Sequence, residues 1–180
     1  IAAATAEYGN TISSWNSDPT RARTILEPAW EEFADLEGTA AGVRLMAAIT
    51  GSLRSSADVA EQLRWVDRLL PIAERLGLVE ETTNAIATRA AVLINLDRTI
   101  EGTALLRGAL QLSIASDLIE VERRCRRLLT FFNQWADPIE GLAVAREGLE
   151  RARRVGSSSF GLLMVGNGVV CAMRVGEWDW

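Results

Sequence analysis

Ile100-Glu101-Gly102 recurs further along the chain as Ile139-Glu140-Gly141, and an aspartate stands just before each copy. That aspartate belongs to a series of nearly constant spacing: Asp18, Asp58, Asp97 and Asp137. A second series follows each aspartate about half a period later: Gly38, Gly77, Ser116 and Gly156. A fixed period of about 40 residues without strand patterning predicts an array of antiparallel helix pairs, each pair being one repeat.

The two series also predict where helices begin and end. An aspartate before a helix is a preferred cap, because its carboxylate accepts hydrogen bonds from the free N–H groups of the first turn. Pro19 and Pro138 follow two of the aspartates, at the first helical position, where proline fits. A glycine just beyond a helix can adopt the left-handed conformation that ends it. We therefore expect Asp58, Asp97 and Asp137 to cap the second helix of a pair.

Apolar residues at steps of three and four predict about nine helices. Their expected ranges are 1–15, 19–36, 39–54, 59–76, 79–95, 98–115, 118–134, 138–155 and 158–174. Pro28 and Pro71 lie inside two of these ranges, where proline removes a backbone donor, so we expect a local kink at each. The expected fold is all-α: a right-handed α-solenoid of helix pairs, forming a single segment over residues 1–180 of a longer chain.

The last of these ranges, 158–174, is apolar nearly all round. A membrane span needs about 20 apolar residues, so this shorter run does not predict a membrane protein. We expect instead a helix that protein covers on both sides, with its second partner beyond Trp180.

The composition excludes several classes of chemistry. The chain has no histidine, which excludes histidine-dependent triads, general bases and metal ligands. Cys125 and Cys171 lie in apolar helical patterns without a CxxC spacing, so we expect buried free thiols in a reducing, cytoplasmic environment. We expect no enzyme activity, no cofactor and no metal in this segment. Residues 118–154 carry 8 arginines against 6 acidic residues in a chain of net charge −5, so direct nucleic-acid binding is not expected either.

Residues 96–102 and 175–179 resemble the phrase that joins two helices in tetratricopeptide repeats, where a turn leads into an acidic helix start. Ala109 and Gly148 lie where that family keeps a second small residue for close helix packing. The period of about 40 residues is longer than the family's repeat of about 34 residues. Longer repeats of this kind are similar to the helical region of large bacterial signalling proteins, which combine an ATPase module with a LuxR-type DNA-binding domain or a class III adenylate cyclase. The resemblance implies a cytoplasmic interaction or regulatory scaffold in signalling or transcriptional regulation.

One side of the helix expected over 118–134 is polar, opposite the apolar Cys125. Its residues are Arg123, Arg126, Arg127, Thr130 and Asn133, and Asn84 is the equivalent of Arg123 one repeat earlier. In tetratricopeptide arrays the first helices of the pairs line the concave groove, so the resemblance implies that these six residues face a groove. Arginine forks there would bind an acidic peptide or a carboxylate. The alternative is a solvated face with local ion pairs, Glu120–Arg124 and Glu122–Arg126.

Three functions stay open from the sequence. The first is an interaction or regulatory scaffold that binds a protein segment or another domain of the same parent chain. The second is a sensor of a small inducer, for which Trp65, Trp135 and Trp178 are candidate pocket residues. The third is a purely structural segment for oligomerisation.

Overall fold

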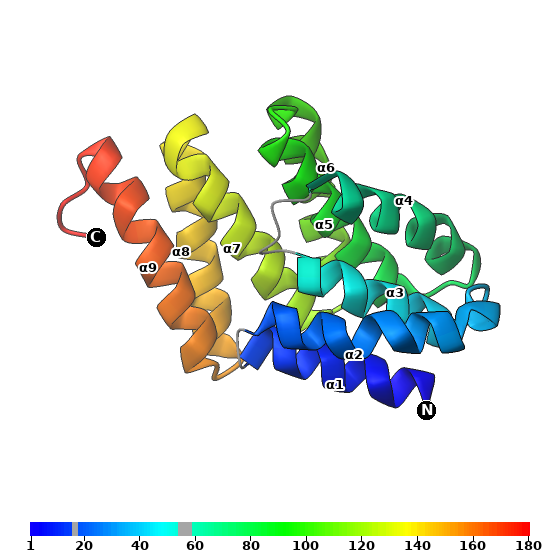
Figure 1. Ribbon diagram of the computed structural model, residues 1–180. Coiled ribbons are helices and arrows are strands. Elements are labelled where there is room, and N and C mark those ends of the chain that lie inside the picture. Colours follow the sequence, from blue (N-terminus) through cyan, green and yellow to red (C-terminus); the bar gives the residue numbers. More distant parts are fainter. Residues whose placement is uncertain (16–17, 54–58) are drawn as a thin grey trace. The chain divides into compact units, whose positions relative to one another are not determined.

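The computed structural model describes residues 1–15, 18–53 and 59–180. Within these ranges the chain is all-helical, with nine α-helices, one 3-10 turn and no strand (Figure 1). The helices are α1 Ala2–Trp15, α2 Pro19–Glu32, α3 Ala40–Ser52, α4 Val59–Arg75, α5 Val79–Asn95, α6 Thr99–Ala115, α7 Ile119–Ala136, α8 Pro138–Arg154 and α9 Ser158–Val175, with the 3-10 turn η1 at Ala34–Leu36. The predicted all-α class is confirmed, whereas the solenoid form of the array and its hand stay predictions.

The predicted ranges agree with the helices to within a few residues, except in α2. The pattern predicts that α2 reaches residue 36, but the helix ends at Glu32 and η1 follows it. Pro28 and Pro71 lie inside α2 and α4, and neither proline ends its helix. Each lies close to buried apolar residues of the same helix, Ala29 and Ala73 among them, so packing holds the helix where proline removes a hydrogen bond.

Two of the predicted aspartate caps are in place. The Asp18 carboxylate accepts a hydrogen bond from the Arg21 N–H, and the Asp137 carboxylate accepts one from the Glu140 N–H. These bonds satisfy N–H groups in the first turns of α2 and α8. The cap predicted at Asp58 lies outside the described residues.

The cap predicted at Asp97 is wrong, because this residue ends the helix before it. Asp97 adopts the left-handed conformation, with φ of 60°. The Arg98 N–H donates to the Leu93 carbonyl across the turn, and α6 begins only at Thr99. Aspartate tolerates this conformation better than most side chains do, so the same residue type serves at a helix end as well as at a helix start.

Left-handed residues end five of the described helices, and most of them are evenly spaced. They are Gly77, Asp97, Asp117, Gly156 and Gly176. Gly77 and Gly156 confirm the prediction. The prediction is wrong by one residue at Ser116, because the following residue, Asp117, takes the left-handed conformation. It is also wrong at Gly38, which follows η1 without a positive φ.

The chain divides into two compact units, Ile1–Leu105 and Leu106–Trp180, each described by itself. In the first unit α1 packs on α2 and α3, α3 packs on α4, and α4 packs on α5. The largest fully buried side chains of this unit are Ile12, Leu26, Leu45, Met46, Leu53, Leu69 and Leu93. The helices are therefore held by their apolar stripes, as expected for amphipathic helices in a packed domain.

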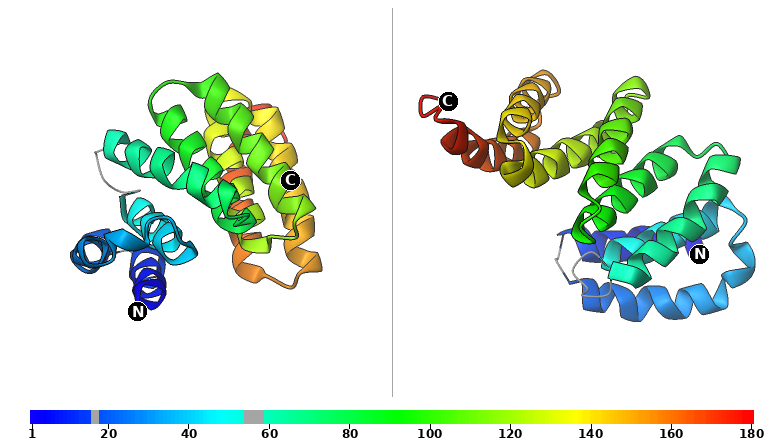
Figure 2. Two further views of the ribbon diagram at one scale, coloured as in Figure 1. Left: turned by 90° about the vertical axis from the view of Figure 1, so that its right-hand side faces the viewer. Right: turned by 90° about the horizontal axis from the view of Figure 1, so that it is seen from above.

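In the second unit α7, α8 and α9 pack on one another, and they stay adjacent in each view (Figures 1 and 2). Small residues on α8 allow this close packing. A Cβ on Gly148 would lie 2.6 Å from Met164 Sδ of α9 and 3.2 Å from Arg126 Cδ of α7. A Cβ on Gly141 would lie 2.7 Å from Cys171 Sγ of α9. The glycines of α8 thus set the distance between α8 and both of its neighbours.

Candidate interaction surface on the second unit

Three of the predicted groove residues are buried between helices. Arg126, Thr130 and Asn133 lie on the side of α7 that packs against α8 and α9. Arg126 Nη1 donates to Glu147 at 3.0 Å, and Asn133 Nδ2 donates to Glu140 at 2.8 Å. The prediction that these residues point away from the core is therefore wrong. The prediction fails because the glycines of α8 allow the α8 backbone to pack against this polar side of α7.

The buried arginine belongs to an ion-pair network that joins α7 to α8. Arg126 Nε donates to one oxygen of the buried Glu122 at 2.9 Å, which confirms the predicted Glu122–Arg126 pair. Arg151 donates to the other oxygen of Glu122 at 3.0 Å and to Asp117 at 2.8 Å. These hydrogen bonds, with that to Asp117 the strongest, raise the pKa of Arg151 above its ordinary value. Because each buried charge already has a partner, the network holds two helices together and is not an anion site.

The exposed side of α7 carries a different set of residues. Arg123, Arg127, Phe131 and Trp135 follow one another at four-residue steps, so they wind slowly along one side of the helix. Phe131 is 51% exposed and Trp135 is 73% exposed, while the two arginines are partly buried. Arg123 pairs with Glu120 at 2.6 Å. We call these four residues the α7 row; it consists of two cations followed by two aromatic rings.

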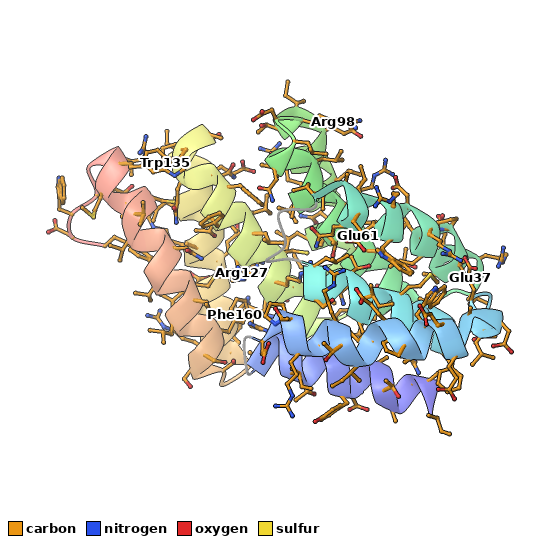
Figure 3. All side chains as sticks on the ribbon, in the orientation of Figure 1. Glu37, Glu61, Arg98, Arg127, Trp135 and Phe160 are labelled. Atoms are coloured by element: carbon orange, nitrogen blue, oxygen red, sulfur yellow. The ribbon has the colours of Figure 1, made fainter. Side chains whose placement is uncertain are left out.

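The aromatic end of the α7 row lies beside the C-terminal end of α9 (Figure 3). The guanidinium carbon of Arg174 lies 4.1 Å from the centre of a Trp135 ring, a cation–π contact. The contact fixes the indole from one side and leaves most of its surface in solvent. The α7 row therefore begins with two arginines, and Arg174 of α9 borders its aromatic end.

Asn84 and the tryptophans that the sequence suggested take different positions. Asn84 lies on α5 in the first unit, so the prediction that it continues the row of groove residues expected from Arg123 to Asn133 stays a prediction. Trp65 packs edge to face on Trp30, with ring centres 5.3 Å apart, and belongs to the core of the first unit. Trp178 is an exposed residue after α9.

The cysteines offer no reactive thiol. Both are free and buried, and burial raises the pKa of Cys125 to about 11 and also raises that of Cys171. A thiol with a raised pKa is protonated at neutral pH and is a poor nucleophile. Among the residues that the structure describes, no group of three or more carboxylate or cysteine side chains is placed to hold a metal ion.

Phe131 and Trp135 together form a candidate site that was not predicted from the sequence. Aromatic residues at helical spacing are usually core residues, and the sequence suggested Trp135 only as a candidate pocket residue, without Phe131. The spacing in the sequence could have revealed this site. Phe131 and Trp135 follow Arg123 and Arg127 at four-residue steps, and residues four apart share a side of a helix.

No protein-family model, curated protein or solved structure matches the chain.

Proposed function

We propose that this chain is a helical-repeat interaction module, and that the α7 row binds a segment of a partner protein. The observation that carries the proposal is Trp135, a large indole that is 73% exposed and has the Arg174 guanidinium against its ring. The internal period and the resemblance to tetratricopeptide repeats support a regulatory scaffold within a larger signalling or transcription-regulating protein. The partner is then a segment of another protein or another domain of the same parent chain.

The residue types of the α7 row fit protein recognition. Tryptophan and arginine are enriched among the few interface residues that carry most of the binding energy. Phe131 and Trp135 supply apolar area that the second unit leaves uncovered. Arg123 and Arg127 supply planar forks that match a carboxylate.

The charges of the α7 row indicate that the partner segment carries an acidic residue. Glu120 lies with its side chain 71% exposed and neutralises Arg123, so it occupies the position that a partner's carboxylate would take. A segment with an acidic residue beside a large apolar one would replace Glu120 and cover the two rings. Binding is expected to weaken as salt is added, because exposed charges are screened.

The test is a library of random short peptides displayed on phage and selected on the full chain. The expected binders carry an acidic and a large apolar residue, and they lose about tenfold or more in affinity with Trp135→Ala or Arg127→Ala. Trp178→Ala is the matched control, because Trp178 is an equally exposed tryptophan at 74%. It is expected to leave the affinity unchanged.

Two outcomes would overturn the proposal. Binders that tolerate Trp135→Ala and Arg127→Ala would place the binding site elsewhere. Self-association of the chain that Trp135→Ala abolishes, without any selected peptide, would assign the row to an oligomer interface, which is the structural alternative.

A further inference from the structure

The guanidinium of Arg174 is held by an aromatic ring and not by a carboxylate. It lies 4.1 Å from the centre of a Trp135 ring, and within the described residues the Arg174 side chain forms no ion pair and donates no hydrogen bond. Glu177, the next acidic residue along the chain, pairs instead with Arg146 of α8. Asp137, two residues after Trp135, caps α8. Arg174 is therefore a positioned cation whose N–H donors are available to a ligand.

Arg174 also ends an exposed side of α9 that is equivalent to the α7 row. One repeat of 39 residues separates Trp135 from Arg174, and the same period aligns Leu162, Gly166 and Val170 with the rest of the row. Leu162 is 74% exposed, Gly166 is exposed and Val170 is half-buried. By length and composition alone, α9 is the one helix in the described part of the chain that could cross a membrane, but its other side is buried against α7 and α8. The exposed surface of the α7 row thus continues onto α9.

The spacing of the α7 row matches that of an extended chain. Residues four apart in an α-helix lie about 6 Å apart along its axis. In an extended segment alternate residues share a side and lie about 6.6 Å apart. One side of such a segment can therefore meet Arg127, Phe131 and Trp135 in turn, and its next residue on that side reaches Arg174 (Figure 3). An extended segment makes these four contacts with about seven residues, where a helix needs about thirteen.

We propose that Arg174 binds an acidic side chain of an extended partner segment, and that a second acidic side chain about six positions away lies against the arginines of the α7 row. Two large apolar side chains between them, on the same side of the segment, cover Phe131 and Trp135. This proposal rests on the function proposed above, and it names the cation and the charge pattern that select the partner. The planar fork of Arg174 suits a carboxylate, and its contact with the indole lowers the entropy lost on binding.

The carboxylate is that of a side chain and not of a chain end. Backbone N–H groups usually bind the C-terminal carboxylate of a peptide. Arg174 lies in the last turn of α9, where the helix presents free carbonyl groups and no free N–H groups. An acidic side chain needs only the guanidinium, so it fits this end of the helix.

The probes are synthetic peptides with an acetylated start and an amidated end, so that only side chains carry charge. The first is Glu-Ser-Leu-Ser-Leu-Ser-Glu, whose side chains read the same in both directions. The second has glutamine in place of the last glutamate. Each peptide is titrated into the full chain and followed through the indole N–H signals in NMR spectra. The Trp135 signal is expected to move, whereas that of Trp178, exposed to a similar extent, is expected to stay.

The peptide with two glutamates is expected to bind about fivefold more tightly than the peptide with one, as for a favourable charge pair at a surface. In Arg174→Gln the two peptides are expected to bind equally, because the second carboxylate has lost its partner. Arg153→Gln is the matched control, since Arg153 is an exposed arginine of α8 outside the α7 row. It is expected to retain the fivefold difference. Added salt is expected to reduce the difference in the wild type.

A third peptide of the same composition tests the extended geometry. In Glu-Ser-Leu-Leu-Ser-Ser-Glu the two leucines are adjacent, so they point to opposite sides of an extended chain and only one can cover a ring. This peptide is expected to bind more weakly than the first. Equal binding of the two peptides would contradict the extended segment.

Three further results would overturn the proposal. A fivefold difference that survives in Arg174→Gln would leave binding on the α7 row, and with it the proposed function, but would remove Arg174 from the site. A Trp135 signal that no peptide moves would contradict the charge pattern, and the proposed function would then fail only if the phage selection also yields no binder that depends on Trp135. A one-glutamate peptide with a free C-terminal carboxylate that binds as tightly as the first peptide would assign Arg174 to a partner's chain end.

Discussion

Asp97 and Asp117 hold a backbone conformation that is unfavourable for most L-residues. Their φ angles are 60° and 51°, and each ends a helix where a glycine would be the unstrained choice. Asp117 has a second role, because its carboxylate pairs with Arg151. Asp97 is therefore the position at which the cost of the left-handed conformation can be measured with the fewest other changes.

Asp97→Gly is expected to raise the free energy of unfolding by about 0.5–1 kcal/mol, because glycine adopts the left-handed conformation without a steric penalty. Equilibrium urea unfolding measures the change. The comparison is Asp137→Ala, which removes a hydrogen-bonded N-cap and is expected to lower the free energy by about 1 kcal/mol. A loss of that size for Asp97→Gly would mean that Asp97 acts as a cap after all.

At the scale of one helix, α6 shows how glycine serves two opposite purposes. Gly102 faces α5, where a Cβ would lie 2.7 Å from the Ala90 carbonyl oxygen and 2.5 Å from Ile94 Cγ1. Gly108 lies in the same helix, and nothing lies within 4 Å of the position of its Cβ. The first glycine is required by packing against a backbone that cannot yield, whereas the second only lowers helix propensity.

Gly102→Ala is expected to lower the free energy of unfolding by about 1–3 kcal/mol, because the added methyl group overpacks the α5–α6 contact. Gly108→Ala is expected to raise it by about 0.5–1 kcal/mol, through helix propensity alone. Thermal or urea unfolding of the two variants provides the test. Equal effects of the two substitutions would contradict the close approach of α6 to α5.

The elements were predictable from the sequence because their signals are local. Apolar steps and turn residues recur at an even spacing, and each helix depends on its own stretch of chain. Which side of α7 is exposed was not predictable in the same way, because burial depends on a neighbouring helix. Arg126, Thr130 and Asn133 form a polar stripe like any solvated one, and only the packing of α8 through Gly141 and Gly148 makes that stripe interior. The Arg–Glu pairs at (i, i+4) did not indicate that this side of α7 is buried, since such pairs also stabilise exposed helices.

At the scale of the whole molecule, the boundary between the two compact units falls inside a helix. The first unit ends at Leu105 and the second begins at Leu106, and both residues belong to α6. Helix formation is cooperative, so a break in the middle of α6 would cost the helix hydrogen bonds on both sides. We therefore expect the units to unfold together, although each has its own core.

The expected result is one unfolding transition, with the same midpoint by far-ultraviolet circular dichroism and by tryptophan fluorescence. The Trp30–Trp65 pair reports on the first unit, and Trp135 and Trp180 report on the second. Gly102→Ala, made in the first unit, is expected to shift both midpoints by the same amount. Midpoints that separate would show that the units unfold independently.

The even spacing of the helix-ending residues has an evolutionary consequence. From α4 onward the described helices are of nearly equal length, and left-handed residues at 77, 97, 117, 156 and 176 close five of the six. One inserted residue within such a helix would rotate every following side chain by about 100° and turn its apolar side away from its neighbours. Substitutions are tolerated far more readily. Descendants of a common ancestor would then diverge in residue identity while they conserve the lengths between turns.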